Sequence, residues 1–187
     1  MKYMMYHKSN NPALYFKPTK KDYHRFSQAL KTVIAAQQGV AKEPLFLCLG
    51  TDRLTGDCLG PLVGHKLNKT IGNRACIFGT LEHPVHALNL HDTLAKIRLS
   101  FSNPYVIVVD ASLGLPSHIG NITLSTHPLF PGEGIHKKLP SVGDLSITGI
   151  VNSCHGNPTR LLQNTRLHLV NQLADFICTG LINNFPF

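Results

Sequence analysis

Two aspartates of this chain are placed so that they could act on one substrate. Asp57 lies in a glycine-rich loop that follows the apolar run 45–49, and Asp110 directly follows the apolar run 105–109. Since parallel strands lie about 4.8 Å apart and end at one edge of a sheet, we expect the two strand ends to lie roughly 5 to 10 Å apart. Two carboxyl groups in one cleft can share one proton, so that one is ionised and acts as a general base while the other is protonated and acts as a general acid. They can also share a divalent metal with an imidazole.

Each aspartate also has a purely structural interpretation. Asp57 could cap the helix that is expected from Leu59, and Asp110 could cap the turn after its strand. The two acids occur together at the ends of two apolar runs, and this joint placement favours the catalytic interpretation. We therefore predict Asp57 and Asp110 as catalytic residues.

A histidine is the expected third member of the site. The chain has eleven histidines, so any one of them is weak evidence by itself. His127 follows the strand-like stretch 121–125, which would bring it to the same edge of the sheet. We predict His127 as the third catalytic residue and, with Asp57 and Asp110, as a ligand should a divalent metal bind. The sequence indicates no other cofactor.

Four further residues are predicted to contact the substrate. Asp52 and Arg53 lie in the same glycine-rich loop, where a local ion pair between them is the alternative. His83 flanks a loop and a helix start, and it is the second choice for the site histidine. Glu133 lies in the glycine- and proline-rich stretch 131–144, whose composition is typical of a loop that could contact the substrate at the rim of the cleft.

The apolar pattern predicts the elements that position these residues. Residues 1–18 form an irregular N-terminal arm, and residues 19–187 form a single α/β domain. Strands are expected at 45–49, 75–78, 105–109, 121–125 and 145–151, and helices at 19–39, 59–72, 85–99 and 158–182. Strands that alternate with helices predict a three-layer α/β fold, with a mostly parallel twisted sheet and helices on both faces.

Composition narrows the class of protein. The 187 residues carry a net charge of +8, but the basic residues are scattered and no nucleic-acid-binding signature accompanies them. The N-terminus does not resemble a secretory signal, and no apolar run reaches the length of a membrane span. Five cysteines without metal-ligand spacing indicate reduced thiols in a cytoplasmic protein. A thiolate at Cys58, just before a helix start, is an alternative nucleophile.

Four segments carry a resemblance to a known family. In order along residues 40–182 they read FLCLGTDRLTGDCLGPLVG, GTLEHPVHALNL, VIVVDASLG and PGEGIHKKLPSVGD. In these segments the chain resembles the YyaC family of sporulation proteins. That family is similar in fold to the germination protease and to the hydrogenase maturation proteases.

The resemblance implies roles for particular residues. The two essential aspartates of the germination protease would fall on Asp57 and Asp110. In the maturation proteases, the metal-contacting acid would fall on Asp57, the strand-end aspartate on Asp110 and the histidine on His127. Gly50-Thr51 stands where both groups have Gly-Asn.

These features lead to one expected function and two alternatives. The first is a sporulation protein with a peptidase-like cleft, in which paired aspartates cleave a protein or peptide such as a spore protein. Its expected location is the cytoplasm of the mother cell or forespore. The second is a non-catalytic module that binds a peptide or protein partner in the same cleft. The third is metal-dependent hydrolysis of a non-peptide amide. No direct contact with nucleic acid or membrane is expected, and homo-oligomerisation stays open.

Overall fold

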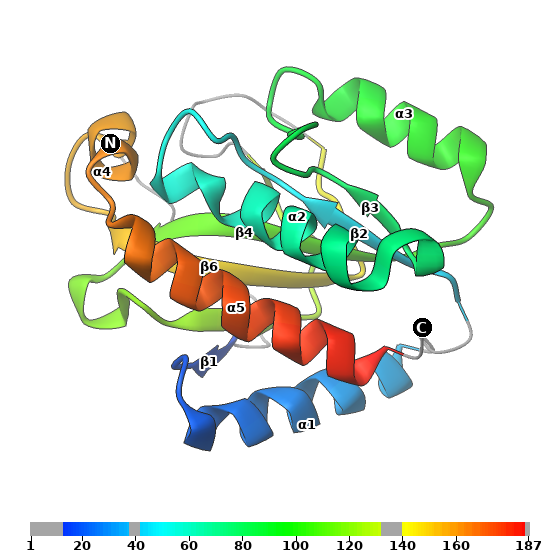
Figure 1. Cartoon of the computed structure of the whole chain (residues 1–187), viewed down its shortest axis with the longest axis horizontal. Coiled ribbons are helices and arrows are strands. Elements are labelled where there is room, and N and C mark those ends of the chain that lie inside the picture. Colours follow the sequence, from blue (N-terminus) through cyan, green and yellow to red (C-terminus); the bar gives the residue numbers. More distant parts are fainter. Residues whose placement is uncertain (1–12, 38–41, 132–139, 186–187) are drawn as a thin grey trace.

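A single six-stranded sheet forms the centre of the protein (Figure 1). The computed structural model describes residues 13–37, 42–131 and 140–185. The sheet has the order β1-β5-β6-β4-β2-β3. Its strands are β1 (Leu14–Phe16), β2 (Pro44–Cys48), β3 (Cys76–Phe78), β4 (Tyr105–Gly114), β5 (Ile122–Ser125) and β6 (Leu145–Ser153). The neighbours β3, β2, β4 and β6 are parallel, whereas β5 is antiparallel to both β6 and β1.

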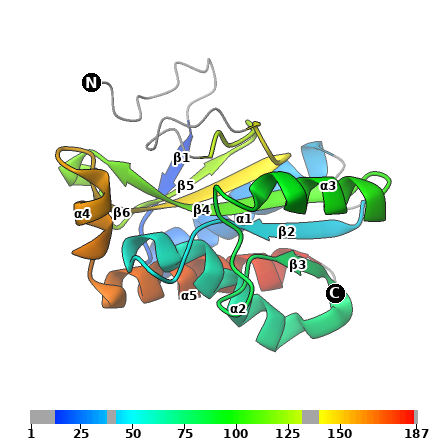
Figure 2. The ribbon, with the colours of Figure 1, turned by 90° about the horizontal axis from the view of Figure 1, so that it is seen from above.

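Helices cover both faces of the sheet, which confirms the predicted three-layer α/β fold (Figures 1 and 2). One face carries α1 (Lys20–Ala36), α2 (Leu59–Ile71) and α5 (Leu167–Asn184), and the other carries α3 (Leu90–Ser100). Residues of β2 alternate between the two layers: Phe46 packs in the cluster under α1, α2 and α5, and Leu45 and Leu47 pack in the cluster under α3. A strand buried on both faces is apolar throughout, so this strand reads as one continuous run in the sequence.

The predicted elements occur, with differences at some ends. Residues 14–16 were expected to be irregular but form β1, because they pair with β5 in the register Leu14 to Leu124. The expected helix at 85–99 begins only at Leu90. The Asn89 side chain accepts a hydrogen bond from the backbone N–H of His86 and donates one to the Pro84 carbonyl, and these bonds hold 84–89 as a loop.

The expected C-terminal helix is two helices. A break at residues 164–166 separates α4 (Pro158–Gln163) from α5. The Asn152 side-chain amide, at the end of β6, donates hydrogen bonds to the Leu161 carbonyl and to the Thr165 hydroxyl. These bonds attach α4 to the end of the sheet, so α4 lies at the edge where the parallel strands end (Figure 2).

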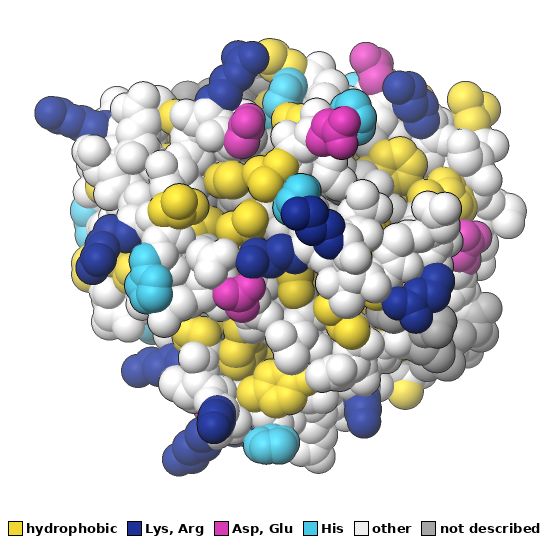
Figure 3. Space-filling model, viewed as in Figure 1, with side chains coloured by type: hydrophobic (Ala, Val, Ile, Leu, Met, Phe, Trp, Pro, Cys, Tyr) yellow, Lys and Arg dark blue, Asp and Glu magenta, His cyan; other side chains and the backbone are white. Residues whose placement is uncertain are grey.

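The distribution of basic side chains and the length and apolarity of the helices relate to the expectations about nucleic acid and membranes. On the face that carries α1, α2 and α5, lysine and arginine side chains are dispersed rather than gathered in one patch (Figure 3). Within the described ranges, no helix is both long enough and apolar enough to cross a membrane.

Candidate functional site

The loop after β2 holds Asp57 close to the end of that strand. Asp57 belongs to a short 3-10 turn, Gly56–Cys58, which leads directly into α2. The backbone N–H of Thr51 donates to the Asp57 carboxylate at 2.9 Å and also to the Asp57 carbonyl at 3.2 Å. Gly60 lets α2 begin against the strand, since a Cβ there would lie 2.0 Å from the Leu49 carbonyl oxygen. The glycines of the loop therefore permit a close packing that fixes the Asp57 side chain.

Asp110 lies on β4 just beyond the point where β2 ends. The last residue of β2, Cys48, pairs with Val109, so Asp110 is the first residue of β4 without a β2 neighbour in the ladder. The strand itself continues to Gly114 beside β6. The Asp110 carboxylate accepts a hydrogen bond from the Ala111 N–H at 2.8 Å. Because β2 stops and β4 continues, this side chain faces the loop that carries Asp57.

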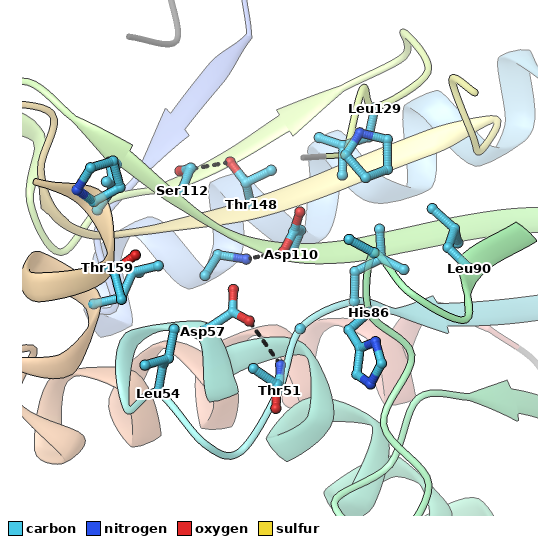
Figure 4. Close-up of a pocket in the computed structure, with 18 of the residues that line it drawn as sticks. Thr51, Leu54, Asp57, His86, Leu90, Asp110, Ser112, Leu129, Thr148 and Thr159 are labelled. Carbon is cyan, nitrogen blue, oxygen red and sulfur yellow. Dashed lines mark hydrogen bonds between the residues drawn. The ribbon is translucent and has the colours of Figure 1, made fainter. Parts of the chain in front are cut away.

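The two carboxyl groups face each other in one cleft (Figure 4). Burial raises the pKa of both, and the Asp57 charge further raises the pKa of Asp110, which lies well above its ordinary value. The Thr51 N–H and the nearby His86 act in the opposite direction on Asp57 and limit the rise of its pKa. Asp57 is therefore the carboxyl group that ionises first, and Asp110 is the one that keeps its proton.

The cleft has a volume of about 400 Å³, in the range of sites for small ligands and short peptide segments. Its wall is mainly apolar, with contributions from Leu54, Leu88, Leu113, Leu129, Phe130 and Leu162. Hydroxyl groups of Ser112 and Thr148 also line it, and these two groups lie 3.3 Å apart. The site thus combines two acids and several hydroxyl groups with a mainly apolar wall.

The four residues that were predicted to contact the substrate differ in their positions relative to the cleft. Arg53 lines the cleft, in the same loop as Asp57. Asp52 and His83 are exposed and lie outside its lining. Glu133 lies outside the described residues. The ion pairs of the described ranges do not include one between Asp52 and Arg53.

The expected position of His127 is wrong. This residue is exposed, it is absent from the cleft lining, and its ring nitrogen lies 3.5 Å from the Ser125 hydroxyl. The reason is the direction of β5. That strand is antiparallel to β6, with Ser125 opposite Ser146, so its carboxyl end points to the opposite edge of the sheet from the aspartates.

Among the described residues, His86 is the histidine that lines the cleft. The bridge between Leu49 and Val85 and the hydrogen bond from the Gly50 N–H to the Val85 carbonyl, 2.8 Å, place its loop beside the end of β2. From the sequence we prefer His83, which lies in the same segment, and the local pattern gives no reason to choose His86. Only the bridge between Val85 and Leu49 shows that His86 lies beside the end of β2.

Two further expectations concern a metal site and a thiolate nucleophile. Among the described residues, no group of three or more His, Cys, Asp or Glu side chains is arranged to hold a metal ion, and His127 is not near the aspartates. Burial raises the pKa of Cys58, and the negative charges of Asp52 and Asp57 raise it further. These effects oppose a thiolate at that position.

Comparison with known proteins identifies a similar sequence. The chain is similar to a Bacillus subtilis (strain 168) protein described as "Uncharacterized protein YyaC", with 43% identity over 157 residues that cover 83% of this chain and 77% of the relative. This similarity confirms the predicted YyaC resemblance.

A solved structure is also similar. The [NiFe] hydrogenase maturation protease HycI from Thermococcus kodakarensis KOD1 superposes with a TM-score of 0.52, 18% identity, and coverage of 83% of this chain and 99% of that one. At this identity the likeness concerns the fold alone, and it shows that the fold of the chain is similar to that of this maturation protease. The model of the family described as "Protein of unknown function (DUF1256)" matches residues 15–180, and the chain belongs to that family.

Proposed function

We propose that this protein is a peptidase-like hydrolase of sporulation, in which Asp57 and Asp110 together direct water onto a peptide bond. The observation that carries the proposal is the pair of facing carboxyl groups in a largely apolar cleft. Their environments make one easier to ionise than the other, which is the arrangement that general acid–base catalysis needs. The maturation-protease fold supports the same class of reaction.

The reaction follows from the protonation states. Asp57, as the carboxylate, takes a proton from water while the water oxygen attacks the carbonyl carbon of the peptide bond. Asp110, as the carboxylic acid, gives its proton to the carbonyl oxygen. The C–N bond then breaks as the amine nitrogen receives the proton from Asp57, and a hydroxyl of the intermediate returns a proton to Asp110. The products are a carboxylic acid and an amine, and both aspartates regain their starting states.

The cellular setting is part of the proposal. The resemblance to the YyaC family of sporulation proteins, which the 43% identity to the Bacillus subtilis protein supports, favours action in the cytoplasm of a sporulating cell. A protein or peptide of the mother cell or forespore is then the substrate, with spore proteins as the first group to test.

The test is hydrolysis of a peptide library and of a spore-protein extract, with new termini identified by mass spectrometry. We expect the unmodified protein to cleave, and Asp57→Asn and Asp110→Asn each to lower kcat/KM by about 10²–10⁴-fold. Asp92→Asn is the matched control, because Asp92 is an exposed acid on α3 outside the cleft. No cleavage by the unmodified protein, or equal cleavage by the aspartate variants, would overturn the proposal.

A binding module on the same fold is the second candidate. Two observations favour it: the apolar wall of the cleft, and the threonine at position 51 where the peptidase groups have asparagine. Capture of a peptide that stays intact, weakened by Asp57→Asn and Asp110→Asn but not by Asp92→Asn, would establish this function in place of hydrolysis.

A further inference from the structure

We propose that the substrate is an extended peptide segment with bulky apolar side chains on both sides of the bond that is cleaved. This inference rests on the proposed function, because it specifies what the same cleft takes up. It follows from the positions of the apolar residues relative to the two carboxyl groups. Six of the apolar residues that line the cleft form two groups, and the labelled Leu54 and Leu129 lie on opposite sides of the pair (Figure 4).

The first group, called the α4 lobe, consists of Leu54, Leu162 and Pro158. Figure 4 places Leu54 and Thr159 on one side of Asp57 and Asp110. Leu162 belongs with them because a Cβ on Gly56, in the same loop as Leu54, would lie 2.8 Å from its Cδ2 atom. Pro158 begins α4 and also lines the cleft. This lobe joins the loop after β2 to the helix after β6.

The second group, called the α3 lobe, consists of Leu88, Leu129 and Phe130. Leu129 and Leu90 lie on the opposite side of the carboxyl pair in Figure 4. Leu88 precedes Leu90 in the loop that leads into α3, and Phe130 follows Leu129. All of these residues line the cleft.

Exposure indicates that the α3 lobe is open to a ligand. Leu88 is 77% exposed and Phe130 is 44% exposed, although both border the cleft. Large apolar side chains that are gathered at a concave site, rather than scattered singly, are typical of a surface that a ligand covers. A substrate side chain that covers them removes apolar area from water, which favours binding.

The central position of the acids sets the register of the substrate. A peptide that brings its carbonyl carbon to Asp57 and Asp110 must run into the α4 lobe with one flank and into the α3 lobe with the other. Ionised side chains at those flanks would lose hydration against leucine and proline, which is unfavourable. Apolar side chains gain from the same contact, so the cleft selects them on both sides of the scissile bond.

The experiment is a peptide series in which the residue on either side of the cleaved bond is Leu, Ala or Asp. We expect the unmodified protein to prefer Leu over Ala by about 10-fold or more at each flank, and to reject Asp. Leu54→Asn should reduce the preference at one flank, and Leu88→Asn at the other. Leu99→Asn is the matched control, because Leu99 is 88% exposed at the end of α3 and does not line the cleft.

A binding measurement separates this inference from the catalytic proposal. Fluorescence anisotropy with the same peptides, carrying a fluorescent label, measures their binding to the Asp110→Asn variant without cleavage. Leu-flanked peptides that bind but are never cleaved by the unmodified protein would support the recognition and overturn the hydrolysis. Cleavage without any preference for Leu would overturn this inference and leave the hydrolysis standing. An unchanged preference in both Leu54→Asn and Leu88→Asn, with folding confirmed by circular dichroism, would also overturn it.

Discussion

Gly50 and Asp57 are in direct backbone contact at the end of β2. A Cβ atom on Gly50 would lie 2.0 Å from the carbonyl oxygen of Asp57, and the φ angle of Gly50 is +130°. The same stretch carries the hydrogen bond from the Thr51 N–H to the Asp57 carboxylate. The position of the Asp57 carboxyl group therefore depends on the absence of a side chain at residue 50.

The first prediction concerns this contact. Gly50→Ala should lower the free energy of unfolding by about 2–4 kcal/mol, because it adds a clash to an unfavourable backbone angle. Gly72→Ala is the control, since Gly72 also has a positive φ (+54°) but a Cβ there meets nothing within 4 Å. We expect about 1 kcal/mol for the control. Urea unfolding measures both values, and equal losses would contradict the importance of the Gly50–Asp57 contact.

The second prediction is a pH dependence of stability. The pKa of Asp110 is raised in the folded protein, so the folded state binds this proton more tightly than the unfolded chain, in which the carboxyl titrates near 3.8. The stabilising contribution is complete below the unfolded pKa and is lost as the pH rises through the folded pKa. Asp110→Asn stays neutral at every pH, so its stability relative to the unmodified protein should increase as the pH rises.

Thermal or urea unfolding from pH 3.5 to pH 8 measures this difference. Each tenfold difference in proton affinity between the folded and unfolded states corresponds to about 1.4 kcal/mol. Asp92→Asn, which changes an exposed acid, should show no such growing difference. A parallel course for Asp110→Asn and the unmodified protein would mean that the Asp110 carboxyl is not kept neutral by folding.

The third prediction concerns His86. Its positive charge lowers the pKa of Asp57, so His86→Asn should raise that pKa and move the acidic limb of the kcat/KM profile to higher pH. In the neutral form of the ring, the imidazole Nδ1 accepts a hydrogen bond from the Leu88 N–H at 3.3 Å, and asparagine keeps an oxygen that can accept the same bond.

His91→Asn is the matched control for that shift, because His91 is exposed on α3 and outside the cleft. A carbon-13 NMR titration of the Asp57 carboxyl gives the same information without an activity assay. An Asp57 titration that is identical in His86→Asn and the unmodified protein would contradict the electrostatic role.

The fourth prediction concerns the attachment of α4. The Thr165 hydroxyl donates to the Leu161 carbonyl at 2.9 Å and accepts from the Asn152 amide at 3.1 Å, and the residue is buried. Thr165→Val should lower the free energy of unfolding by about 1–2 kcal/mol, because buried partners lose hydrogen bonds. Since α4 supplies Pro158 and Leu162 to the cleft, binding of Leu-flanked peptides should weaken as well.

Thr179→Val provides the comparison for that variant. Thr179 makes the same kind of bond, to the Asp175 carbonyl at 2.8 Å, but on the exposed face of α5. We expect its effect to stay within about 0.5 kcal/mol. If the two threonine variants lose equal stability, the buried hydrogen bonds at α4 do not carry the effect.

Much of the site was readable in the sequence because its signals are local. The apolar run before Asp57 and the run before Asp110 each predict a buried strand, and the glycines between β2 and α2 indicate a close turn. Both acids follow from the rule that groups after parallel strands meet at one edge of the sheet. The α/β class follows from the alternation of strand and helix patterns along the chain.

Strand direction and chain contacts over long distances were decided only by the tertiary structure. The run 121–125 looks the same whether its strand is parallel or antiparallel, yet its antiparallel pairing with β6 sends His127 to the far edge. The bridge of Val85 to Leu49 brings His86 to the cleft instead. The break before α5 depends on the hydrogen bonds from the Asn152 amide to the Leu161 carbonyl and the Thr165 hydroxyl. Periodicity records which residues are buried, whereas pairing partners far apart in the chain determine which buried strand ends meet.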